Sequence, residues 1–201
     1  MAISDVLAFN TWSVEGIVVE DLGLKNYISL QPRIVPKTGA RYAGNKFHKS
    51  RTFIVERLMN KLMVPGHKAK KHWRSSGHMT GKANHVYNIV FEAFKILEQR
   101  TKKNPIEVFV KALENAAPRE EILTIEYGGA RYPKAVECSP QRRVDTALRF
   151  FAQGSYTKSF NAKKGIVEAL ADELLNAYNL SPNSVAISKK NDVERQSDSA
   201  R

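Results

Sequence analysis

Apolar residues recur at helical spacing through most of the chain. In about residues 51–63, Ile54, Leu58 and Leu62 recur at every fourth position, so they would form one apolar stripe on a helix. The same pattern predicts helices over about residues 85–101, 104–115, 139–153 and 162–178. Because each of these segments has one apolar face, we predict a mainly α fold, a helical bundle of about five to six helices.

Local signals mark several helix ends. Pro65-Gly66 would end the first helix. Asn104-Pro105-Ile106-Glu107 places Asn at the N-cap, Pro at the first helical position and Glu at the third, a cap that contributes about 1 kcal/mol. Ser139-Pro140 predicts the start of the fourth helix. The tail, residues 188–201, alternates charges with few apolar residues; it is either a helix that needs a partner surface or a frayed end.

The period changes to two at about residues 121–138, which predicts a β-hairpin. Apolar residues alternate from Glu121 to Tyr127, and Gly128-Gly129 supplies a two-residue turn that tolerates positive φ. Pro133 in the return strand favours an exposed edge. Since an isolated hairpin is marginally stable, we expect this one to lean on the helices or to project toward a ligand.

The first 50 residues show no helical pattern. Val14–Val19 predicts a short strand. Residues 37–50 form a basic, glycine-containing arm with few apolar residues, which we expect to order only on its partner. We therefore divide the chain into an N-terminal extension with a basic arm, residues 1–50, and a helical domain with the hairpin, residues 51–201.

Positive charge is concentrated in residues 37–85. The chain carries 32 Lys and Arg and a net charge of +12, of which this segment contributes +11, with Glu56 as its one acidic residue. Such crowding is tolerable where a polyanion neutralises it, and each phosphate contacted releases a condensed counterion. The predicted contacts are Lys37, Arg41, Tyr42, Lys46, Lys49, Arg51, Arg57, Lys61, Lys68, Lys70, Lys71, Arg74 and Lys82.

Aromatic residues stand among these charges, which is typical of proteins that bind structured RNA. Tyr42, Phe47 and Trp73 would stack on unpaired bases while the cations contact phosphates. A second basic surface is predicted on the fourth helix, where three arginines lie off the apolar face. These are Arg142, Arg143 and Arg149.

Metal and redox chemistry find little support in the sequence. The histidines at 67, 72, 78 and 85 are five, six and seven residues apart, unlike the spacing of helical zinc ligands, so we predict no metal site. We expect them to stack on bases or approach phosphates. Cys138, the single cysteine, forms no CxxC pair and is expected to be a small packed residue in a reducing, cytoplasmic compartment.

No nucleophile elbow, Walker A loop, HExxH or dinucleotide motif is present, so we predict no catalytic residues, no cofactor and no enzyme. The apolar runs are too short to span a bilayer, and no signal peptide is evident. An RNA-modifying or RNA-cleaving enzyme that uses His and Lys is the alternative of a different class; it would need a cluster of His with a base or metal in a cleft.

An ordered set of short motifs covers about residues 9–201. They are Ile54–Met63, Asn104-Pro105, Pro118-Arg119-Glu120, Gly128-Gly129-Ala130, Ser139-Pro140-Gln141-Arg142-Arg143, Ala171-Asp172-Glu173-Leu174, and Ser188-Lys189-Lys190 with Glu194-Arg195. Each is weak alone, but in this order they resemble the small-subunit ribosomal protein seven family. Phe9–Ser13 and Gly39–Ala43 resemble the archaeal and eukaryotic members, and we interpret the chain as archaeal.

The resemblance implies binding to the 3′ major domain of small-subunit rRNA and nucleation of head assembly. It places rRNA contacts in the arm 37–51 and at Arg142, Arg143 and Arg149. It also implies a protruding hairpin near the exit tRNA site and mRNA, with Tyr127, Gly128, Gly129 and Arg131 at the tip. Expected partners are rRNA, exit-site tRNA, mRNA and neighbouring head and platform proteins, with no membrane and no required homo-oligomer. A non-ribosomal protein that binds structured RNA is the alternative within this class.

Overall fold

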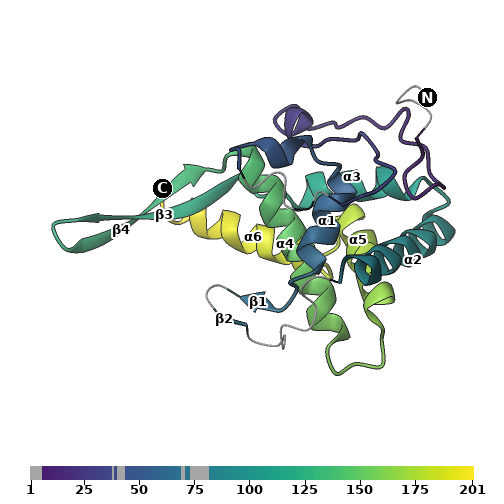
Figure 1. Cartoon of the computed structure of the whole chain (residues 1–201). Coiled ribbons are helices and arrows are strands. Elements are labelled where there is room, and N and C mark those ends of the chain that lie inside the picture. Colours follow the sequence, from purple (N-terminus) through teal and green to yellow (C-terminus); the bar gives the residue numbers. More distant parts are fainter. Residues whose placement is uncertain (1–5, 38, 40–43, 69–70, 73–81) are drawn as a thin grey trace.

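Six α-helices form the main body of the part of the chain that the structure describes (Figure 1). This computed structural model describes residues 6–37, 39, 44–68, 71–72 and 82–201. The helices are α1 (Ile54–Leu62), α2 (Ala83–Thr101), α3 (Pro105–Ala116), α4 (Pro140–Ser159), α5 (Ile166–Tyr178) and α6 (Val185–Asp198). Two 3-10 turns precede them, η2 (Lys25–Tyr27) and η3 (His48–Arg51). The predicted mainly α fold is confirmed.

The core lies where α2, α3 and α4 surround α5. Leu170 and Leu174 of α5 are fully buried there. Phe94, Phe109 and Phe151 connect the outer helices through it, with ring centroids 5.9 Å apart for the first pair and 6.5 Å for the second. These separations suit favourable aromatic packing, so the apolar stripes predicted from the sequence meet in one core.

The N-terminal region packs on the same core. Trp12 is buried against α2, and its Nε1 donates to Glu98 Oε2 at 3.0 Å. The predicted strand at Val14–Val19 is wrong, because Gly16 turns the chain at a φ of +78°. The backbone N–H of Glu20, just beyond it, donates to the Glu114 carboxylate at 2.7 Å instead of to a neighbouring strand.

The predicted starts of α3 and α4 are confirmed, since these helices begin at Pro105 and Pro140. Asn104 Oδ1 accepts from the backbone N–H of Ile106 at 3.0 Å, which confirms the start of α3. By contrast, α4 continues to Ser159, and α5 begins only at Ile166. Gly154 lies inside α4, where the start of α6 packs closely against it. A Cβ at this position would stand 3.0 Å from Val185 Cβ, so the absence of a side chain allows this close approach.

The C-terminal tail is a helix, and its partner surface belongs to the chain itself. Glu173 of α5 is fully buried and holds the start of α6: its Oε1 accepts from Ser184 Oγ at 2.7 Å and from the Ala186 N–H at 2.9 Å. Lys158 Nζ neutralises the other oxygen at 2.6 Å. The helix then lies against α4 and β3.

The predicted hairpin is confirmed. Strands β3 (Glu120–Tyr127) and β4 (Ala130–Glu137) pair antiparallel and project from the bundle (Figure 1). Gly128 and Gly129 close the two-residue turn with φ of +59° and +81°, as a type I′ turn requires. A second, short antiparallel pair, β1 (His67–Lys68) with β2 (Lys71–His72), follows α1 in the chain.

Candidate nucleic-acid interface

Three cations gather around the carboxylate of Asp145, and a fourth, Arg149, lies near one of them, Lys61. We call this group the Asp145 cluster; it comprises Asp145, Lys49, Arg57, Lys61 and Arg149. Arg57 and Lys61 are one turn apart on α1, as Asp145 and Arg149 are on α4, so two helix faces meet there. Lys49 Nζ contacts one carboxylate oxygen, and Arg57 Nη2 donates to the other at 3.1 Å. Four cations with one carboxylate leave a net charge of +3.

Burial and the neighbouring charges both shift pKa values in this cluster. Burial alone would raise the pKa of Asp145, but the hydrogen bond from Lys49 and the charges of Arg57 and Lys61 outweigh it and hold that pKa below the ordinary value. Burial lowers the pKa of Lys61; Asp145 opposes this, while Arg149 and the other cations lower it further. The site would therefore be stabilised by another anion.

The cations divide into an internal and an outward group. Arg57 is 5% exposed, and its Nη1 also donates to the Tyr27 carbonyl at 2.9 Å. Lys49 and Lys61 are half-buried, and Arg149 is exposed. Among the described residues, no carboxylate lies within ion-pair distance of Arg149. Arg57 thus anchors Asp145, whereas Lys49, Lys61 and Arg149 form a face that solvent or a ligand can reach.

The first turn of α4 differs from the sequence prediction. The predicted position of Arg143 on an exposed basic surface is wrong. Arg143 is buried, with Nε donating to the Pro118 carbonyl at 3.2 Å and Nη2 to Asp21 Oδ2 at 2.7 Å. Arg142 is exposed but pairs with Glu121 of β3 at 2.7 Å. Helical spacing could not reveal either partner, because both carboxylates come from distant segments.

The remaining cations of the basic segment are mostly exposed. Asn45, Lys46, Phe47, His48 and Arg51 line a surface depression of about 380 Å³ beside η3. Lys37 and Lys82 are also exposed. Lys68 and Lys71 lie on the short pair β1–β2. Four predicted contacts lie outside the described residues: Arg41, Tyr42, Lys70 and Arg74.

The hairpin tip is exposed and nearly neutral. Tyr127 is 81% exposed, and Gly128 and Gly129 are open to solvent. Arg131 Nε lies 3.6 Å from Glu126 Oε2 across the strands. Electrostatic attraction to phosphate is therefore much weaker at the tip than at the Asp145 cluster.

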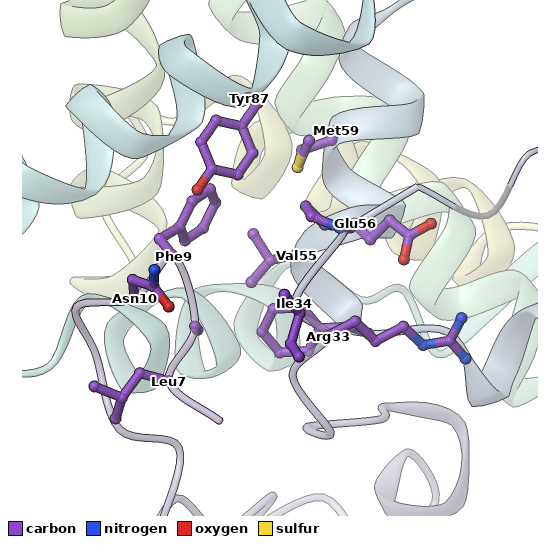
Figure 2. A pocket seen from close by; sticks show the side chains of 12 residues that line it. Leu7, Phe9, Asn10, Arg33, Ile34, Val55, Glu56, Met59 and Tyr87 are labelled. Atoms are coloured by element: carbon purple, nitrogen blue, oxygen red, sulfur yellow. The ribbon is translucent and has the colours of Figure 1, made fainter. Parts of the chain in front are cut away.

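The cavity shown in Figure 2 does not have the dimensions of a substrate site. It measures about 50 Å³ and lies between the N-terminal region and helices α1 and α2, where Phe9, Val55, Met59 and Tyr87 line it. Ligand sites are typically several times larger. In the described part of the chain, no group of three or more His, Cys, Asp or Glu could hold a metal ion, and no helix is long and apolar enough to cross a membrane.

Cys138 is a packed residue, as predicted. It is 8% exposed, and its N–H donates to the Arg119 carbonyl at 2.8 Å. Burial, followed by the nearby Glu121 carboxylate, raises the pKa of its thiol to about 11. The thiol therefore stays protonated at neutral pH, which opposes a nucleophilic role.

A helical bundle with an outward cationic face, exposed aromatic rings and a projecting hairpin defines a nucleic-acid-binding protein. The family model described as Ribosomal protein S7p/S5e matches residues 24–201. The chain belongs to this family, in its archaeal form.

Archaeal relatives match almost the whole chain. The small ribosomal subunit protein uS7 of Nanoarchaeum equitans is 52% identical over 193 residues, which cover 96% of this chain and 98% of that protein. The proteins of the same name from Methanothrix thermoacetophila and Archaeoglobus fulgidus are each 45% identical, over 96% and 98% of this chain and 98% and 96% of their own lengths. These relatives confirm the predicted family and its archaeal type. Archaeal ribosomal proteins work in the cytoplasm, which is the predicted localisation.

Proposed function

We propose that this protein is a structural constituent of the small ribosomal subunit that binds the 3′ major domain of small-subunit rRNA and nucleates assembly of the head. Family membership supports the ribosomal role. The observation that carries the binding mode is the Asp145 cluster, where Lys49, Lys61 and Arg149 converge from three elements with one carboxylate between them. Phosphates of folded RNA are the anions that this face fits.

The cations take two roles in this proposal. Lys49, Lys61 and Arg149 contact phosphates directly, together with the exposed cations of the basic segment. Arg57 and Arg143 act from inside the protein, because each is buried against a carboxylate and a carbonyl. Arg142 reaches rRNA by exchanging Glu121 for a phosphate. The contacts predicted at Arg41, Tyr42, Lys68, Lys70, Lys71 and Arg74 rest on charge and resemblance.

Replacing Lys61 and Arg149 together by Met should weaken binding to a 3′ major domain rRNA fragment and lower the slope of log affinity against log salt by about two, since each lost phosphate contact lowers it by about one. The matched control replaces Lys25 and Lys163, two exposed lysines outside the cluster, by Met. This control removes the same net charge, so an equal loss of affinity in both variants would mean that the cluster has no special role.

The hairpin has a different task in the proposal, at the exit tRNA and mRNA. The family resemblance suggests it, and the near-neutral, exposed tip is consistent with it. Because the tip adds little attraction for phosphate, assembly should depend on the bundle rather than on the hairpin.

Removal of Glu126, Tyr127, Ala130 and Arg131 tests this division. These residues form two facing pairs, so their removal preserves the Gly-Gly turn, the strand register and the net charge. We expect subunits to contain the shortened protein at nearly wild-type occupancy, while tRNA retention or reading-frame accuracy changes. A folded variant that no longer binds rRNA would instead make the hairpin an assembly element.

A further inference from the structure

Phe47 is an exposed aromatic residue in an unfavourable backbone conformation. Phe47 is 49% exposed, and its φ is +66°. Bulky residues rarely adopt this left-handed region, which glycine adopts freely. The conformation starts the turn η3, where the Phe47 carbonyl accepts from the Ser50 N–H at 3.0 Å. Neither core packing nor backbone preference therefore explains an aromatic residue here.

One cation lies over the ring, and another lines the depression that the ring borders. Lys46 Nζ lies 5.1 Å from the ring centroid. Arg51 and Asn45 line the same depression, whose volume of about 380 Å³ can hold a nucleobase. Lys49, two residues after Phe47 in η3, belongs to the Asp145 cluster. The ring therefore lies among basic residues, two positions along the chain from the outward cationic face.

This combination fits an unpaired base with its flanking phosphates. Aromatic rings beside cations bind single-stranded nucleotides by stacking on the base while the cations contact the backbone. The ring of Tyr127 at the hairpin tip is more exposed, but Glu126 and Arg131 beside it offset each other. Charge complementarity therefore favours RNA at Phe47 and distinguishes it from Tyr127.

We propose that Phe47 stacks on an unpaired nucleobase of the rRNA, with Lys46 and Arg51 on the adjoining phosphates. This rests on the proposed function, because it assigns one contact within the rRNA interface. The proposal explains why a phenylalanine occupies a position that glycine would adopt more easily.

The test compares Phe47→Leu, which retains an apolar side chain without a π face, with Phe47→Trp, which enlarges that face. The full chain is titrated with a 3′ major domain fragment of an archaeal small-subunit rRNA at several salt concentrations. We expect Phe47→Leu to bind about 5- to 150-fold more weakly with an unchanged salt slope, and Phe47→Trp to bind at least as tightly as wild type. Arg51→Met should weaken binding and lower the slope by about one.

Two further measurements separate stacking from folding and from protein contacts. Phe47→Gly should melt no lower than wild type, because glycine tolerates the positive φ, yet should bind as weakly as Phe47→Leu. Ultraviolet irradiation should cross-link a base to a peptide containing residues 45–51 in the wild-type complex, but not in the Phe47→Leu complex.

The outcomes distinguish the inference from the proposed function. Wild-type protein that fails to bind the rRNA fragment would overturn the proposed function. Wild-type binding with salt dependence, together with an unchanged affinity of Phe47→Leu, would overturn the stacking proposal alone. A third outcome would also overturn the stacking proposal: Phe47→Leu binds rRNA with full affinity, the wild-type complex gives no cross-link, and yet Phe47→Leu enters subunits poorly. This outcome would assign the ring to a contact with a neighbouring protein.

Discussion

Raising the salt concentration from 50 to 200 mM should weaken binding to the 3′ major domain by about three to five orders of magnitude. This range is expected for proteins that neutralise roughly six to ten phosphates, because each contact releases counterions whose entropy gain falls as salt rises. The structure offers seven exposed or half-buried cations in the described part of the two predicted surfaces for this role, besides Arg142, which pairs with Glu121. They are Lys37, Lys46, Lys49, Arg51, Lys61, Lys82 and Arg149.

Isothermal titration or filter binding across this salt range measures the slope directly. Circular dichroism at each salt concentration provides the control that the protein stays folded. An affinity that does not change with salt would mean that phosphate contacts do not dominate, and the role assigned to the basic segment would be wrong.

Replacing Asp145 by Ala should destabilise the free protein by about 3–5 kcal/mol, since it leaves Arg57 buried without its carboxylate. For a domain of this size the melting temperature should fall by about 10 °C. The matched control is Asp192→Ala on α6. Asp192 forms an exposed ion pair with Arg195, one turn further along the same helix, and this pair should contribute less than about 1 kcal/mol. The double variant Arg57→Met, Asp145→Leu should recover much of the loss, because it removes both buried charges.

The pH dependence of the free energy of unfolding provides a second test of the role of Asp145. The folded-state pKa of Asp145 lies below its ordinary value, so its stabilising contribution is fully present above about pH 4 and is lost as the pH falls through the folded-state pKa. The difference in the free energy of unfolding between wild type and Asp145→Ala should therefore be constant near neutral pH and shrink in acid. A difference that grows in acid would contradict the role of the Asp145 charge.

The elements with local signals were predictable. Helices α1, α2 and α3 follow from apolar periodicity, and the Asn104 cap fixes the start of α3 because one side chain satisfies a backbone N–H nearby. The hairpin follows from alternation and from Gly128-Gly129, whose positive φ values are local properties. In each case, the information lies within a few residues of the element.

The elements that depend on distant contacts were not predictable. Helix α6 has few apolar residues, and its first turn is held by Glu173 from the preceding helix. Helix α4 continues through Gly154, where the start of α6 packs closely against it, and the spacing of apolar residues does not indicate this contact. The predicted strand at Val14–Val19 is absent because Gly16 turns the chain, and the backbone just beyond it is held by the distant Glu114 carboxylate.

The candidate site was predicted in its charge but not in its geometry. Composition alone indicates a basic surface, yet Arg57 and Arg143 lie inside the protein because Asp145 and Asp21 approach them from distant segments. Asp145 carries no signal in the sequence beyond its spacing from Arg149 on one helix face. The motifs that indicate the family contain Arg57, Arg143 and Glu173, and in the structure all three are buried and hydrogen-bonded, so part of the motif pattern reflects folding.

The most direct test of the central claim is chemical footprinting of small-subunit rRNA with the purified protein. We expect wild-type protein to protect backbone positions confined to the 3′ major domain. The variant with Met at positions 61 and 149 should lose a contiguous part of this protection, while the variant with Met at positions 25 and 163 should retain all of it. Protection spread evenly over the rRNA, or an identical footprint for the two variants, would contradict a specific interface built on the Asp145 cluster.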